Sequence, residues 1–265
     1  MTSGRTRSLV VHRYRDGVCS RDNDQVIVEA PLEIRLDDHR VTTTMRTPGH
    51  DAELAVGFCF ADGLLDGASV VGVHTGQPGV PVDGGGNTIV VDTAGRAPVP
   101  APRLSTTTSS CGWCGTEDID GVLSAIAPVP TALALDPAAM DALAERVIGQ
   151  QALFDATGGV HAAGLFDAAG DVKLVREDIG RHNAVDKLVG RLLLDGRLPA
   201  EGLGLFVSGR TSFEIVQKAA AAGFGAVVAV SAPSSLAIDA ARIAKLTLAG
   251  FARPGRLNLY VEPNS

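Results

Sequence analysis

The stretch LGLFVSGRTSFEIVQKAAAAGFGAVVAV, residues 203–230, governs the architecture of the C-terminal half of the chain. Two wholly apolar runs, 203–207 and 226–230, have the length of strands and flank a segment with helical spacing. A capping box formed by Thr211 and Glu214 is expected to open that helix. Strands that are apolar throughout are typical of parallel sheets buried on both faces. The stretch therefore predicts a strand–helix–strand unit within a sheet covered by helices.

The same alternation continues on both sides of this unit. Helices are expected at 137–151, 183–194 and 236–248, a hairpin at 159–166 and 172–176, and a last strand at 257–261. Apolar strands that alternate with helices predict an α/β fold with a largely parallel sheet, packed on both faces.

The N-terminal half has a different composition, with more β character. Strands are expected at 25–29, 32–36, 41–45 and 88–92, with one helix from Asp51 to Gly63 and Gly- and Pro-rich loops at 76–86 and 97–102. We place a boundary near Leu104. It separates a smaller β-rich domain, residues 1–104, from a domain of residues 105–265, so that the whole chain is α+β.

Composition excludes several classes of protein. The net charge is −7, which does not favour nonspecific binding to nucleic acid. No segment reaches the ~20 consecutive apolar residues that a membrane span needs. The first 15 residues contain four arginines but no long apolar core, so they do not resemble a signal peptide. We therefore expect a cytoplasmic protein that binds neither nucleic acid nor membrane.

Two of the four cysteines lie three residues apart, in Cys111-Gly112-Trp113-Cys114-Gly115. A structural zinc site needs four ligands, and no second close pair supplies them, so we expect no structural metal. A thioredoxin-like exchanger carries its pair on a helix after an early strand, whereas this pair follows a Thr- and Ser-rich segment. The flanking glycines also make two buried, inert thiols an unfavoured interpretation. The remaining hypothesis is a sulfur carrier, with an exposed thiolate on a flexible loop.

Several cationic residues are placed at junctions between strands and helices. They are Arg181 and His182, the run Ser208-Gly209-Arg210, and the run Phe251-Ala252-Arg253-Pro254-Gly255-Arg256. Loops that follow parallel strands gather at one edge of a sheet, and helix N-termini there bind anions. The pattern indicates a ligand rich in phosphate. His161 starts an expected strand. It is either a packed, hydrogen-bonded histidine, which we favour slightly, or a proton donor or ligand contact near the cysteine segment.

With these motifs in view, the chain resembles the FdhD family, the formate dehydrogenase accessory sulfurtransferases. The resemblance runs from about Val28 onward and is specific, since long motifs match in the same order. The matching segments are the stretch from Thr47 to Phe58, the cysteine segment 111–115, and segments 159–163, 177–187, 208–214, 231–237 and 250–256.

The resemblance implies a function and a set of partners. Such proteins take sulfur from a cysteine desulfurase as a cysteine persulfide. They deliver it to the molybdenum, or tungsten, of bis-molybdopterin guanine dinucleotide for the catalytic subunit of formate dehydrogenase. It implies that Cys111 carries the persulfide, that Cys114 assists, and that residues 251–256 contact the cofactor. It also implies a homodimer.

The family's larger domain is similar to the three-layer cytidine deaminase fold, and this raises a second enzyme class. Zinc deaminases need His-x-Glu and Cys-x-x-Cys on successive helices. The corresponding helix starts here read Arg181-His182-Asn183 and 208–212, which lack the Glu and both cysteines. The other alternative is a non-catalytic chaperone that binds the cofactor, but it leaves Cys111 and Cys114 without a role.

Overall fold

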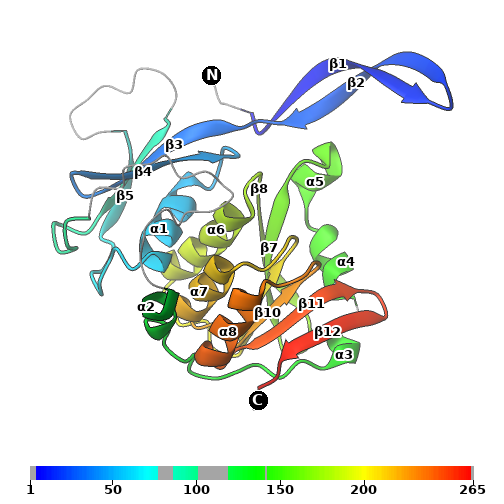
Figure 1. The fold of residues 1–265 in the computed structure, drawn as a ribbon. Helices are drawn as coiled ribbons and strands as arrows, with labels where there is room; N and C mark the ends of the chain where they lie inside the picture. Colours follow the sequence, from blue (N-terminus) through cyan, green and yellow to red (C-terminus); the bar gives the residue numbers. More distant parts are fainter. Residues whose placement is uncertain (1–3, 77–85, 101–118, 141, 264–265) are drawn as a thin grey trace.

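The computed structural model describes residues 4–76, 86–100, 119–140 and 142–263, which form a mixed α/β structure with three sheets (Figure 1). The strands are β1 (Thr6–Arg15), β2 (Val18–Ile27), β3 (Ala30–Leu36), β4 (His39–Arg46), β5 (Gly72–Thr75), β6 (Thr88–Asp92), β7 (His161–Asp167), β8 (Val172–Asp178), β9 (Leu203–Val207), β10 (Ala226–Ala229), β11 (Thr247–Arg253) and β12 (Arg256–Val261). The helices are α1 (Asp51–Ala61), α2 (Ile119–Ser124), α3 (Pro137–Met140), α4 (Leu143–Ile148), α5 (Ala152–Thr157), α6 (Arg181–Leu194), α7 (Phe213–Ala221) and α8 (Ser235–Ala244).

The largest sheet has six strands in the order β12-β11-β10-β9-β7-β8. Its centre, β9-β10-β11, is parallel, but the pairs β7–β8, β7–β9 and β11–β12 are antiparallel. The expectation of a largely parallel sheet is therefore correct only for the centre. A hairpin at each end of the sheet adds the antiparallel pairs.

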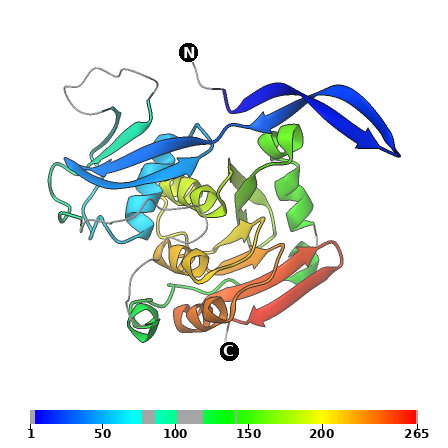
Figure 2. The same cartoon turned by 45° about the horizontal axis from the view of Figure 1, so that its top comes forward.

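Both faces of this sheet are covered, as its wholly apolar strands predicted. In β9, Leu205 and Val207 pack into a core with α6, α7 and α8, whereas Phe206 points to the opposite face. There it joins a second core with Leu143 and Val147 of α4. Figure 2 shows the three long helices on one side of the sheet and α3 to α5 on the other. The likeness to the cytidine deaminase fold stays a prediction.

The N-terminal half forms a four-stranded sheet in the order β4-β3-β6-β5, with α1 against it. Helix α1 also packs on α6 of the C-terminal half, with Gly57 facing Gly190. A Cβ on Gly57 would overlap the carbonyl oxygen of Asp186, and one on Gly190 would overlap that of Glu53. This backbone-to-backbone contact joins the two halves. The boundary predicted near Leu104 lies outside the described residues and stays a prediction.

Sequence patterns missed two N-terminal features. Strands β1 and β2 form a two-stranded ribbon that extends away from the body of the protein (Figure 1). It has no continuous apolar run, because most of its side chains face solvent. The short strand β5 was also missed, since its four residues follow no clear apolar alternation.

Two predicted helices have wrong boundaries. The helix expected at 137–151 is divided into α3 and α4, and α4 ends at Ile148, with Gly149 as its C-cap. The helix expected at 236–248 ends at Ala244, because Lys245 adopts a left-handed conformation. The chain then enters β11, where the Thr247 hydroxyl donates to the carbonyl oxygen of Leu133 at 2.7 Å. Part of the expected helix and of the expected loop 251–256 is therefore strand.

Among the described helices, none combines the length and the apolar character that a bilayer span requires.

Candidate functional site

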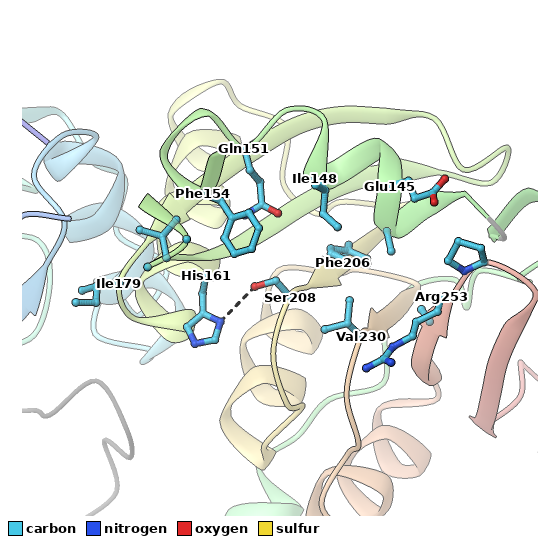
Figure 3. A pocket seen from close by; sticks show the side chains of 16 residues that line it. Glu145, Ile148, Gln151, Phe154, His161, Ile179, Phe206, Ser208, Val230 and Arg253 are labelled. Carbon is cyan, nitrogen blue, oxygen red and sulfur yellow. Dashed lines mark hydrogen bonds between the residues drawn. The ribbon is translucent and has the colours of Figure 1, made fainter. Parts of the chain in front are cut away.

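A cavity of about 620 Å³ lies at the edge of the six-stranded sheet where the parallel strands end (Figure 3). Its volume is within the range of ~300–1,000 Å³ typical of small-molecule sites. Helices α4 and α5 form one wall, and the ends of the strands form the other. The lining residues are Ala144, Glu145, Ile148, Gln151, Phe154, Gly158, Gly159, Val160, His161, Ile179, Phe206, Ser208, Val230, Ala252, Arg253 and Pro254. Ser208 after β9, Val230 after β10 and residues 252–254 at the end of β11 lie together at this edge, whereas Arg210 and Arg256 do not line the cavity.

His161 and Ser208 meet at this edge because β7 begins where its antiparallel neighbour β9 ends. His161 Nδ1 is 3.3 Å from Ser208 Oγ, and that oxygen also accepts a hydrogen bond from the backbone N–H of Ala162 at 2.8 Å. Gly209 is packed closely, since an added Cβ would lie 3.4 Å from the His161 ring and from Arg181 Cδ. His161 is therefore both a hydrogen-bonded and a cavity-lining residue, which combines the two roles left open by the sequence.

The environment of His161 favours its neutral form. Burial lowers the pKa of its imidazole, and the positive charges of Arg181 and His182 lower it further, while the Asp178 carboxylate opposes them weakly. A neutral imidazole can donate one hydrogen bond and accept another, which suits a ligand with both kinds of group.

We expect NMR titration of His161 to give a midpoint below the ordinary value of 6.5. Replacing Arg181 by glutamine removes one of the cations responsible, so the midpoint should rise toward 6.5. Arg210→Gln is the matched control, because Arg210 is not among the groups that act on His161. Equal midpoints for Arg181→Gln and the native protein would contradict this electrostatic account.

His182 forms a separate cluster at the start of α6. Its Nε2 lies 2.9 Å from a carboxylate oxygen of Glu214 and 3.1 Å from Ser212 Oγ. The capping box expected between Thr211 and Glu214 is therefore wrong. Ser212 is the N-cap of α7, and Glu214 pairs with His182 instead. Thr211 forms a β-bridge with Pro233, and its hydroxyl is buried without a hydrogen-bond partner among the described residues.

Several buried side chains of segment 177–187 bind backbone groups of the N-terminal half and so link the two halves of the protein. Lys187 Nζ lies 2.7 Å from Asp178 Oδ2, with both side chains fully buried, and donates to the carbonyl oxygen of Thr47 at 2.9 Å. Asp178 accepts from the backbone N–H of Thr47 at 3.1 Å and from the Asn183 amide at 3.0 Å. The Asn183 amide also donates to the carbonyl oxygen of Met45. These contacts fix β8 and α6 against the end of β4.

Glu177 of the same segment positions a wall of the cavity. Its carboxylate accepts hydrogen bonds from the backbone N–H groups of Leu153 and Phe154, at 3.0 and 2.8 Å. Those groups belong to the first turn of α5, where N–H groups lack partners within the helix. Glu177 therefore holds α5, with Phe154, beside the cavity.

Segment 251–256 is the end of β11, a turn and the start of β12. Ala252, Arg253 and Pro254 line the cavity, whereas Phe251, Gly255 and Arg256 are not among its lining residues. The Arg256 guanidinium lies 5.3 Å from the centre of the Phe251 ring, within cation–π distance. Figure 3 shows the Arg253 side chain near Val230.

The structure thus divides the predicted site residues into groups. His161, Ser208 and 252–254 line the cavity, and Gly209 packs against His161. Arg210 is exposed and does not line it. Cys111 and Cys114 lie outside the described residues, so their placement stays a prediction. The described part of the chain holds no group of three or more potential metal ligands.

Sequence reasoning missed the residues that form most of the wall. Ile148 and Gln151 were assigned to a helix or its end, Phe154 was assigned to no element, and Phe206 was assigned to a buried strand. Phe206 does lie in a strand, but at its end, where one face meets the cavity. No local pattern marks such residues, because they line the cavity only through the packing of α4 and α5 on the sheet.

Comparison with known proteins assigns the chain to a family. A model of the FdhD/NarQ family matches residues 27–265. The chain belongs to the FdhD/NarQ family. It is 45% identical over 264 residues to a protein of Streptomyces avermitilis named sulfur carrier protein FdhD, covering 96% of this chain and 93% of the relative. A protein of the same name from Anaeromyxobacter dehalogenans strain 2CP-1 is 46% identical over 254 residues, which is 90% of this chain and 87% of that one.

The FdhD/NarQ fold is also found among solved structures. A crystal structure from Desulfotalea psychrophila, described as that of a formate dehydrogenase accessory protein, has a TM-score of 0.75 and 24% identity. The match covers 98% of this chain and 99% of that one. At this identity the likeness establishes the fold alone.

Proposed function

We propose that the protein is a sulfurtransferase that carries sulfur as a cysteine persulfide. It receives the sulfur from a cysteine desulfurase and delivers it to the molybdenum, or tungsten, of bis-molybdopterin guanine dinucleotide. The loaded cofactor then enters the catalytic subunit of formate dehydrogenase. The observation that carries the proposal is the 45% identity, over nearly the whole chain, to a relative named a sulfur carrier protein. We infer that the protein acts in the cytoplasm as a homodimer.

The spacing of the two cysteines suits a balanced two-step transfer. The Cys111 thiolate attacks the terminal sulfur of the donor's persulfide, so that a new S–S bond forms on Cys111 and the donor cysteine leaves as a thiolate. The Cys114 thiolate then attacks Cys111 Sγ, and the terminal sulfur leaves as hydrosulfide, with two electrons, toward the metal. The resulting Cys111–Cys114 disulfide is returned to two thiols by a thiol reductant.

The cavity supports binding of the cofactor as the cargo of this reaction. Arg253 supplies a cation that can pair with phosphate, and Arg181, close to His161, adds a second one nearby. The apolar wall of α4 and α5 suits the heterocyclic parts of the same molecule. These residues orient the cargo, while the sulfur chemistry belongs to the two cysteines.

The test is to load the full chain with a cysteine desulfurase and cysteine, and to locate the added sulfur by peptide mass spectrometry. We expect the adduct on Cys111, its loss in Cys111→Ala, and its retention without hydrosulfide release in Cys114→Ala. Cys19→Ala is the control, because Cys19 is an exposed, free cysteine on the ribbon, away from the Cys111–Cys114 segment in sequence. No adduct on Cys111 or Cys114 contradicts the carrier mechanism. If Cys111→Ala still supports formate dehydrogenase activity in cells, the non-catalytic chaperone is the correct function.

A further inference from the structure

We propose that Gln151 is a specificity-determining residue, whose amide binds the hydrogen-bonding edge of a planar heterocycle in the cavity. This inference rests on the proposed function, because the heterocycle belongs to its cargo. The heterocycle is a fused ring whose edge carries a lactam N–H and C=O beside an amino group. Both the guanine and the pterin of the cofactor have such an edge.

The Gln151 side chain is buried, but its amide makes no hydrogen bond with any described residue. The residue is 3% exposed. It is the N-cap of α5, yet its side chain makes no capping hydrogen bond. The amide is not among the fully enclosed polar atoms that lack a partner, so water in the cavity can reach it, and a ligand that replaces this water must supply matching hydrogen bonds. Figure 3 shows the amide directed into the cavity beside Phe154.

Gln151 is held in place by its backbone. Its N–H donates to the carbonyl oxygen of Ile148 at 3.0 Å, and its own carbonyl accepts from Asp155 at 2.9 Å. The next turn is fixed by Glu177, through the N–H groups described above. A side chain on a fixed backbone loses less conformational entropy when it binds a ligand, which favours recognition.

The walls around this amide are mostly apolar, with a cation on the far side. Phe154, Phe206, Ile148 and Val230 give an apolar surface that suits the faces of a flat ring. Arg253 lies on the opposite wall from Gln151, where a phosphate attached to the heterocycle can reach it (Figure 3). The neutral amide offers two donors and one acceptor. It therefore matches a neutral edge with a donor next to an acceptor, rather than a phosphate.

The experiment measures binding of GDP and of a pterin carboxylate to the full chain by calorimetry. In Gln151→Leu, we expect the dissociation constant for the probe that occupies this cavity to rise about 10- to 100-fold, since two hydrogen bonds are lost. Gln150→Leu is the matched control, because Gln150 is the exposed neighbour and does not line the cavity. Guanosine methylated at N1 should show no binding to the native protein if guanine is the ring that Gln151 binds. The two probes thus distinguish the guanine from the pterin.

Stability supplies a second readout. Because the native amide makes no hydrogen bond with the described residues, Gln151→Leu should keep or raise the melting temperature. A lower melting temperature would mean that the amide has a structural partner, and would overturn the proposal. Unchanged affinity for both probes, or no binding of either probe by the native protein, also overturns it.

The binding test is independent of sulfur transfer. If Gln151→Leu weakens binding but no persulfide forms on Cys111 or Cys114, the specificity role stands and the carrier function fails. If the persulfide forms but Gln151→Leu binds both probes normally, the specificity role alone fails.

Discussion

Replacing Lys187 by methionine is expected to lower the free energy of unfolding by about 3–5 kcal/mol, because it leaves the buried Asp178 carboxylate without its cation. The two groups lie 2.7 Å apart with no solvent exposure. The lysine also gives up hydrogen bonds to the carbonyl oxygens of Thr47 and Glu177. Small domains have a total stability of only about 5–15 kcal/mol, so the variant should be partly unfolded or melt at a much lower temperature. Chemical denaturation followed by circular dichroism measures the change.

Two further variants make the test specific. Asp178→Asn combined with Lys187→Met should recover part of the loss, since the unpaired buried charge is removed. Lys173→Met is the matched control, because Lys173 pairs with Asp167 at the same 2.7 Å but is 43% exposed. An exposed pair contributes little, so this variant should unfold like the native protein. If Lys187→Met and Lys173→Met behave alike, the buried pair does not stabilise the junction between the two halves.

A methyl group at Gly57 is expected to destabilise the protein by ~3 kcal/mol or more, at the upper end of what overpacking costs. In an isolated helix the same change, Gly→Ala, would be stabilising. The sign reverses here because the added Cβ would overlap the backbone carbonyl oxygen of Asp186, which cannot move without separating α1 from α6. Gly190→Ala should behave in the same way, since its Cβ would overlap the carbonyl oxygen of Glu53. Thermal unfolding and denaturant midpoints check both.

Gly121→Ala is the control for this prediction. Gly121 lies in α2, and an added Cβ would meet no atom within 4 Å. The substitution should therefore leave the melting temperature unchanged or raise it. If Gly57→Ala and Gly121→Ala both stabilise the protein, the close approach of α1 and α6 is not maintained in solution.

The Lys187–Asp178 pair and the Gly57–Gly190 contact both lie at the junction between the two halves. A buried charged cluster around Lys218 lies at the same junction. Lys218 of α7 lies 2.7 Å from Asp186 and 3.3 Å from Asp62, which follows α1. Although burial acts to lower it, these two carboxylates raise the pKa of Lys218 well above its usual value. Loss of sulfur transfer in variants of segment 177–187 should therefore be compared with stability before a catalytic role is assigned.

The core of the fold could be predicted from local sequence. The apolar runs 203–207 and 226–230 can satisfy their backbone groups only in a sheet and can bury their side chains only if both faces are covered. The helical spacing of 183–194 predicted α6 almost to its ends, and the turn before Asp51 predicted α1. The strand-to-helix position of Ser208 likewise placed it near the edge where the cavity lies, whereas His161 was predicted only to start a strand.

Other features depend on contacts between distant parts of the chain. The break between α3 and α4, the end of α8 at Lys245 and the ribbon β1–β2 were wrongly assigned or missed, because neither propensity nor periodicity marks them strongly. Glu214 was expected to cap its own helix, but His182, 32 residues earlier in the chain, provides a partner 2.9 Å away. The capping-box pattern gave the wrong partner for Glu214, because a local pattern contains no information about residues that only tertiary folding brings close.

Residue types and their order were enough to predict most strands and helices of the C-terminal sheet, the cysteine pair and the family. The packing of distant segments decides three further features: Asp178 and Lys187 join the two halves, Glu177 holds α5, and the Gln151 amide faces the cavity. Burial and hydrogen-bond satisfaction are properties of three-dimensional neighbours, and Gln151 and Ser208 line the same cavity only because α5 packs beside the end of β9.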